Sequence, residues 1–141
     1  MIPKEIKDRK HAKTAWKSGS YRQEKPWGHE LVWGGHDSIH GKILHINAGA
    51  RTSLKYHKLK AETLFFVSGK AKVTFGGENT FVDPVAWPMQ EKDFAAGDTL
   101  LVQSGCPYRI HAIEDCEVIE IGNHLSDAAV RINDDYGRAE Q

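Results

Sequence analysis

Lys55-Tyr56-His57-Lys58-Leu59-Lys60-Ala61-Glu62 leads into Val67-Ser68-Gly69, and this stretch carries the clearest structural signal in the chain. Side chains alternate across a strand, so Lys55 and His57 share one face of an extended segment. Glu62 opens the next strand-like run after a short turn. An imidazole and a carboxylate on neighbouring strands suit a divalent metal such as Zn, Mn, Fe or Ni. A protonated lysine offers a metal no lone pair, so the same stretch also suits acid–base chemistry without a metal.

The surrounding sequence consists of short, β-branched runs separated by turn residues, which is typical of strands. Turn signals such as Gly34-Gly35 and Ser104-Gly105-Cys106-Pro107 end these runs. No strong amphipathic helix lies between them. Runs this short and closely spaced predict an antiparallel sandwich or barrel. The expected strands cover residues 30–33, 42–47, 63–67, 71–75, 99–103, 108–113 and 117–121.

The chain shows no linker-like shift in composition, so we expect one domain. Residues 1–20 form a polar, lysine-rich segment, which is expected to be a mobile arm or a short helix, or else an arm that completes a dimer or covers a pocket. The barrel is expected over residues 21–138, followed by a tail at 139–141. Within it, residues 78–95 are interpreted as a long hairpin connection that covers a pocket. Residues 125–141 are expected to form a final turn or short helix.

Composition excludes several classes of partner. Lys plus Arg and Asp plus Glu each number 19 among 141 residues, so the formal net charge is zero. Binding to nucleic acid needs a surplus of cationic side chains, so we do not expect this protein to bind nucleic acid. No apolar stretch approaches the ~20 residues of a membrane span, and no signal peptide is apparent. Cys106 and Cys116 do not make a disulfide framework, so a cytoplasmic protein with reduced thiols is expected.

A later run brings a further polar side chain to the same region. Tyr108, Ile110 and Ala112 share a strand face, and if that face points inward Tyr108 meets Lys55, His57 and Glu62 at one barrel mouth. Without a metal, His57 is the expected base, Tyr108 the acid and Lys55 an electrostatic clamp for a phosphate or an oxyanion. Arg109 faces outward by parity, but a β-bulge could turn it toward a substrate.

Two motifs resemble those of the cupin superfamily. The first cupin motif, G-x5-HxH-x3,4-E-x6-G, appears as Gly49, Lys55-Tyr56-His57, Glu62 and Gly69 in register. The second, G-x5-P-x-G-x2-H-x3-N, appears as Gly97, Gln103-Ser104-Gly105 and Tyr108 in the histidine position. The resemblance implies an all-β, single-domain, double-stranded β-helix, or jelly-roll barrel. It also implies a homodimer, because cupins commonly pair through their sheets.

A narrower resemblance is to the isomerase domain of type II mannose-6-phosphate isomerase/mannose-1-phosphate guanylyltransferase. The segments that carry it are Lys25-Pro26-Trp27-Gly28, Ser53-Leu54-Lys55-Tyr56-His57, Ala61-Glu62 to Val73, and Val130-Arg131-Ile132 to Arg138. That family's Gln, His, Glu and His metal ligands fall on Lys55, His57, Glu62 and Tyr108, so only His57 and Glu62 fit.

The same resemblance suggests other site residues. It makes Lys42 and Arg131 candidate contacts for a phosphate or carboxylate, beside Arg109. His111 cannot replace Tyr108 as a ligand, because three residues along a strand reverse the face. His45 and His124 remain as alternative ligands, with no geometry favouring either.

Three functions compete at this level. The first is a sugar or sugar-phosphate isomerase or epimerase with a modified metal site, in which a metal or Lys55 stabilises an enediolate. The second is a non-catalytic cupin that binds a small carbohydrate or an anionic metabolite. The third is an iron-dependent dioxygenase, which the missing histidines weaken, because oxygen chemistry needs a redox metal held by several good ligands.

Overall fold

The computed structural model describes residues 2–36, 38–123 and 127–138, so the expected tail at 139–141 lies outside the described residues. Its elements are almost all strands, as the sequence predicts. In chain order they are α1 (Lys4–Lys7), β1 (Tyr21–Lys25), β2 (Gly28–His36), β3 (Ile39–Ile46), β4 (Leu54–Tyr56), β5 (Glu62–Ser68), β6 (Lys70–Phe75), α2 (Asn79–Val82), β7 (Gln90–Ala95), β8 (Thr99–Val102), β9 (Tyr108–Ala112), β10 (Cys116–Asn123) and β11 (Val130–Asn133).

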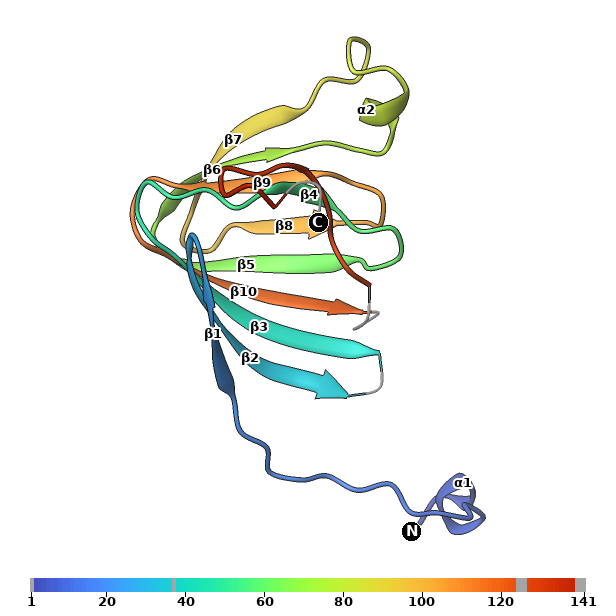
Figure 1. Cartoon of the computed structure of the whole chain (residues 1–141). Coiled ribbons are helices and arrows are strands. Elements are labelled where there is room, and N and C mark those ends of the chain that lie inside the picture. Colours follow the sequence, from blue (N-terminus) through green and yellow to red (C-terminus); the bar gives the residue numbers. More distant parts are fainter. Residues whose placement is uncertain (1, 37, 124–126, 139–141) are drawn as a thin grey trace.

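The strands form two antiparallel sheets that make a single jelly-roll barrel, which confirms the expected fold (Figure 1). One sheet has the order β1-β2-β3-β10-β5-β8 and the other β11-β4-β9-β6-β7. Neighbours in these sheets are often distant in the sequence, as where β10 lies between β3 and β5. This pairing is what places the residues of both cupin-like motifs around one interior.

Alternation along the strands fills that interior with two kinds of side chain. In β5, Leu64 and Phe66 are fully buried, while Phe65 between them is exposed. Val118 and Cys116 of β10 are buried in the same way, and together they belong to an apolar core at one end of the barrel. The same inward faces continue into Glu62 and Glu120, which are also buried. The barrel therefore has an apolar end and a polar end.

Two segments differ from the sequence-based expectation. Residues 78–95 are more than a connection, because they contain the short helix α2 and all of β7, which pairs with β6 from Gln90 to Ala95. Residues 125–141 are expected to form a final turn or short helix; a turn is present at 135–136, but the strand β11, which pairs with β4, precedes it. Both strands are polar or short, so hydrophobic periodicity does not mark them. Backbone pairing with a neighbour stabilises them instead.

The N-terminal arm leaves the barrel and extends away from it, with α1 near its end (Figure 1). Every described residue from 2 to 20 is exposed. The Trp16 ring lies 5.5 Å from the His36 ring at the end of β2, which is the arm's aromatic contact with the barrel. No helix among the described residues is long and apolar enough to cross a membrane.

Two glycines of the first motif provide a matched stability test. Gly69 and Gly49 have positive φ values of 90° and 85°, which disfavour any residue with a Cβ. A Cβ on Gly69 would overlap the carbonyl oxygen of Asp115 and the Cα of Cys116, whereas one on Gly49 would meet nothing within 4 Å. Gly49→Ala should cost only the conformational term, about 1 kcal/mol of unfolding free energy. Gly69→Ala should cost more than about 3 kcal/mol, measured by urea denaturation. Equal losses would contradict the close approach seen at Gly69.

Candidate functional site

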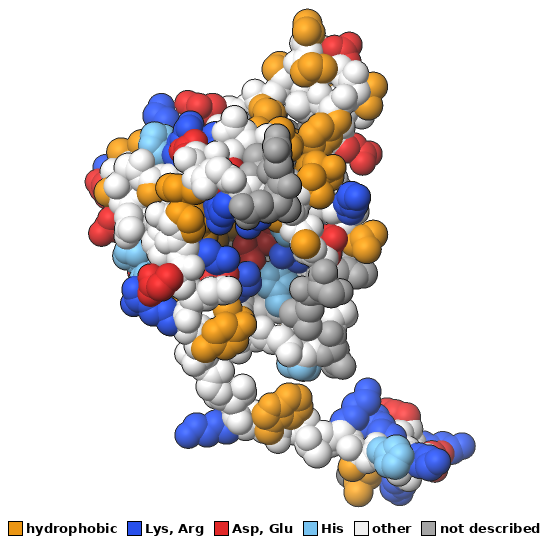
Figure 2. All heavy atoms as spheres, in the orientation of Figure 1, with side chains coloured by type: hydrophobic (Ala, Val, Ile, Leu, Met, Phe, Trp, Pro, Cys, Tyr) orange, Lys and Arg blue, Asp and Glu red, His pale blue; other side chains and the backbone are white. Residues whose placement is uncertain are grey.

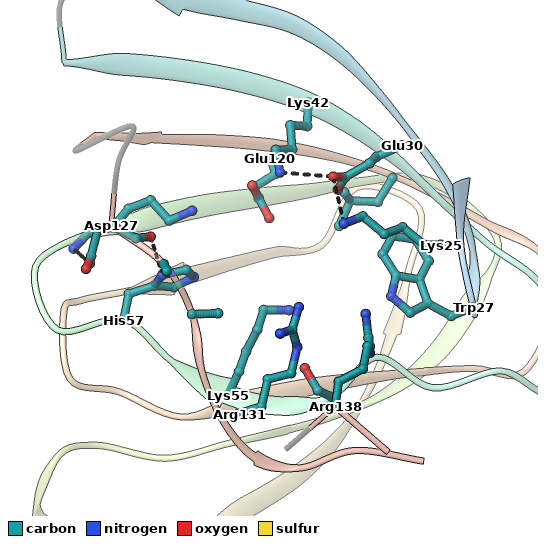
Figure 3. Close-up of a pocket in the computed structure, with 15 residues that line it drawn as sticks. Lys25, Trp27, Glu30, Lys42, Lys55, His57, Glu120, Asp127, Arg131 and Arg138 are labelled. Carbon is teal, nitrogen blue, oxygen red and sulfur yellow. Dashed lines mark hydrogen bonds and ion pairs between the residues drawn. The ribbon is translucent and has the colours of Figure 1, made fainter. Parts of the chain in front are cut away.

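A cavity of about 370 Å³ opens at the polar end of the barrel, a volume in the range of small-molecule sites. Figure 2 shows cationic side chains gathered around this hollow, with acidic side chains inside it. Both sheets contribute to its walls, and Figure 3 shows its charged residues pointing inward from them. The lining residues are Lys25, Trp27, Glu30, Lys42, Leu44, Ser53, Lys55, His57, Lys60, Glu120, Asp127, Ala128, Ala129, Arg131 and Arg138.

The carboxylate of Glu62 lies directly beneath this cavity at the start of β5. Its Oε1 accepts a hydrogen bond from the Tyr108 hydroxyl at 3.0 Å and lies 3.3 Å from Nε2 of His57. Its Oε2 lies 3.6 Å from the ammonium of Lys60. Burial opposes ionisation, yet His57, Glu120 and the nearby lysines hold the pKa of Glu62 well below its usual range. Glu62 is therefore a buried anion that several groups share.

Glu120 of β10 has the opposite electrostatic character. Burial and the neighbouring Glu62 carboxylate raise the pKa of Glu120 to about 8. Two carboxyl groups this close cannot both ionise at low cost, so one proton is held between them. Glu120 is then the protonated partner near neutral pH, and Glu62 is the ionised one. A protonated acid beside an ionised one is an arrangement suited to acid–base chemistry.

His57 follows β4 and is fixed through one ring nitrogen. Its Nδ1 lies 3.2 Å from the carbonyl oxygen of Asp127, which can only accept, so Nδ1 carries the hydrogen. Asp127 is itself held, because its carboxylate accepts hydrogen bonds from the backbone N–H groups of Leu59 and Lys60 at 2.8 and 2.6 Å. These contacts leave Nε2 as the ring atom that can exchange a proton beside Glu62.

A buried trio, His40, Glu62 and Glu120, could hold a divalent metal. Each offers a ligand atom, and these atoms lie within 4.8 Å of one another. Both ring nitrogens of His40 and Oε2 of Glu62 are buried without a hydrogen-bond partner. Burial and the positive charge of Lys60 lower the pKa of His40 to about 4, so its ring is neutral near pH 7 and keeps a free lone pair. One imidazole and two carboxylates fit Zn or Mn.

The positions implied by the cupin motifs fit a metal less well. Lys55 is half-buried and its ammonium lies 4.8 Å from the centre of the Tyr108 ring, as a cation–π contact rather than a ligand. Burial raises the pKa of Tyr108 well above its usual value, so the phenol stays protonated. Its hydroxyl already donates to Glu62, and Tyr108 does not line the cavity. Tyr108 is therefore in contact with Glu62 rather than with the cavity, and its expected role as an acid stays a prediction.

The structure separates the other expected site residues. Lys42 and Arg131 line the cavity. Arg109 does not, because its guanidinium donates to the carbonyl of Thr52 and to Asn133 outside the cavity. This outward placement follows strand parity and does not support the expected substrate contact.

The alternative histidines are also accounted for where they are described. His45 faces the outer surface of β3, where its ring stacks on His29 and pairs with Glu117. His111 lies on the opposite face of β9 from Tyr108, as parity predicts. His124 lies outside the described residues.

Sequence reasoning missed His40 and Glu120, although a signal for both was present. His40 lies two residues before Lys42 and shares its inward face, but β3 begins earlier than the expected run. Glu120 shares a face with Val118 in a run expected to be a strand. An acidic residue on the apolar face of a strand is unusual unless it is paired, and that pattern identifies it.

Comparison with known proteins locates the chain by its fold. No family model and no curated protein matches its sequence. Among solved structures, oxalate decarboxylase from Bacillus subtilis at pH 4.6 superposes with a TM-score of 0.67 and 20% identity over 80% of this chain and 30% of that one. A Bacillus subtilis oxalate decarboxylase structure concerned with Mn(II) centres gives 0.64 and 20% over 77% and 28%. KdgF from Halomonas sp. gives 0.61 and 15% over 73% and 86%.

These likenesses rest on shape, since each identity is at most about a fifth. The chain spans less than a third of the oxalate decarboxylase chains but most of KdgF, which is therefore the better match in domain size. Together with the two facing sheets, they show that this chain has the cupin fold.

Proposed function

We propose that this protein is a cupin-type isomerase or epimerase acting on a sugar or sugar phosphate. The observation that carries the proposal is the position of His57, fixed through Nδ1 and with Nε2 beside a buried carboxylate, in the wall of a small-molecule cavity. Moving a proton between neighbouring carbons needs a group of this kind. The motif resemblance to mannose-6-phosphate isomerase supports the same reaction class.

Several residues at the polar end of the barrel have separate roles in the proposed reaction. His57 exchanges the proton at Nε2, while Glu62 stabilises the charge that the ring gains. Tyr108 fixes Glu62 through its hydroxyl and keeps the carboxylate aimed at His57. Lys55 lines the same wall and supplies positive charge for an anionic group of the substrate. The backbone carbonyl of Asp127 sets which ring nitrogen of His57 is reactive.

His40, Glu62 and Glu120 would hold a divalent ion, which would supply Lewis-acid polarisation of a substrate carbonyl when bound. Such an ion would take the place of the proton that Glu120 otherwise holds, because ligating carboxylates are ionised. Lys60 competes with an ion for Oε2 of Glu62, since its ammonium already lies 3.6 Å from that atom.

The proposed catalytic role of His57 can be tested by comparing the same substitution at His57 and at His45, which lies outside the cavity. His57→Asn removes the proton-exchanging ring, so kcat/KM for aldose–ketose interconversion of hexose phosphates should fall about 10²- to 10⁴-fold. His45→Asn, on the outer face of β3, should leave kcat/KM unchanged. Substrate interconversion can be followed by NMR, with circular dichroism to check that both variants fold. Equal activity of the two variants would rule out the role of His57.

The metal trio is tested by metal content rather than activity. His40→Ala removes one of three ligands, so Mn²⁺ or Zn²⁺ bound after dialysis should drop from about one per chain to near zero. His57→Ala leaves the trio intact and should keep the ion. Elemental analysis of the dialysed proteins distinguishes the two sites. Loss of the ion in His57→Ala with retention in His40→Ala would place the metal at the usual cupin ligand positions instead.

A second candidate function is a non-catalytic cupin that binds a small carbohydrate or anionic metabolite. It is favoured by Lys55 and Tyr108, which occupy positions where the resembling families have metal ligands. Calorimetry decides between the two, since saturable binding of hexose phosphates with no interconversion over days would support the binding protein.

A further inference from the structure

Two cations of the cavity lie side by side on one wall. Lys55 of β4 and Arg131 of β11 are direct partners in the antiparallel pairing of these strands. Both line the cavity, and Figure 3 shows their side chains extending together from this wall into it. Like charges at directly opposite positions of a strand pair destabilise it unless something lies between them.

The other cations of the cavity have carboxylate partners. Lys25 and Lys42 lie 3.5 and 3.1 Å from the same oxygen of Glu30. Lys60 lies 3.6 Å from Glu62. Arg138 makes a bidentate pair with Asp134, at 2.8 and 3.1 Å. Each of these four cations, which line the cavity in the described part of the chain, is therefore paired with a carboxylate.

Lys55 and Arg131 have no such partner. Among residues 2–36, 38–123 and 127–138, no carboxylate oxygen lies within 4.0 Å of the Lys55 ammonium or of a guanidinium nitrogen of Arg131. The Nε–H of Arg131 is buried and has no hydrogen-bond acceptor. The ammonium of Lys55 has the face of the Tyr108 ring as its neighbour. A buried donor without an acceptor is costly, and native proteins seldom retain one without a reason.

We propose that Lys55 and Arg131 form a subsite for the oxyanion of an anionic carbohydrate, either the phosphate of a sugar phosphate or the carboxylate of a sugar acid. A guanidinium fork matches the oxygens of both groups, and the adjacent ammonium adds a point charge. The inference rests on the proposed function, because an anion held here places the rest of the sugar beside His57, which follows β4 two residues after Lys55 and lines the same cavity.

The first test uses inorganic phosphate as the probe and thermal unfolding as the readout. At constant ionic strength, phosphate in place of chloride should raise the Tm of the wild-type chain in a saturable manner. Arg131→Gln and Lys55→Met should abolish this rise. In chloride alone both variants should melt at or above the wild-type temperature, because a repulsive pair has been relieved. Lys72→Met, which removes a surface lysine paired with Glu91 and Asp93, should keep the full response.

The second test compares glucose 6-phosphate, glucuronate and glucose by calorimetry. One of the two anionic sugars should bind, glucose should bind at least about tenfold more weakly, and Arg131→Gln should weaken the anionic sugar roughly 10- to 100-fold. The preferred anion identifies a phosphate or a carboxylate subsite. Glucose binding as tightly as both anions, or an unchanged phosphate response in both cavity variants, would overturn the subsite. Intact anion binding without any interconversion would instead overturn only the proposed isomerase activity.

Discussion

The ionised carboxylate of Glu62 is the group on which the polar end of this barrel depends. It is buried at the start of β5, where the apolar face of the strand reaches the cavity. Tyr108, His57 and Lys60 all turn toward it, and its charge keeps the proton on Glu120. An isolated buried anion would be prohibitively costly, so these partners are required for folding. At this end of the barrel the inward-facing side chains are polar and charged instead of apolar, and the cavity lies beside them.

Much of this architecture is readable from the sequence because it rests on short-range rules. The alternation within β5 and β9, and the glycines Gly49 and Gly69 at tight turns, follow from strand geometry and backbone sterics. Strand β11 is not readable in this way. It has four residues, in which apolar and polar side chains do not separate cleanly onto two faces, and it forms because the backbone of β4 provides its hydrogen-bond partners. Such pairing is a property of the folded barrel and leaves no local hydrophobic pattern.

The site was predictable only as far as the motif positions reach. His57, Glu62 and Lys55 lie together as expected, because their spacing fixes their strand faces. His40 and Glu120 come from β3 and β10, which lie beside each other only after the sheet has formed. The motif also cannot show that Lys55 lies opposite a second cation, because that cation, Arg131, comes from β11 and reaches Lys55 only when β11 pairs with β4. Because Lys55 and Tyr108 occupy two of the usual ligand positions, the proposed metal site draws on His40 and Glu120 instead, and the proposed oxyanion subsite lies on the wall formed by β4 and β11.

The most direct test of this account is a crystal structure of the protein soaked with Mn²⁺ and a sugar phosphate, with data collected at the manganese absorption edge. The account predicts an anomalous peak bounded by His40, Glu62 and Glu120, and phosphate density between Lys55 and Arg131. A manganese ion bound by His57 with Glu62, together with a sugar phosphate that avoids the wall formed by β4 and β11, would contradict it.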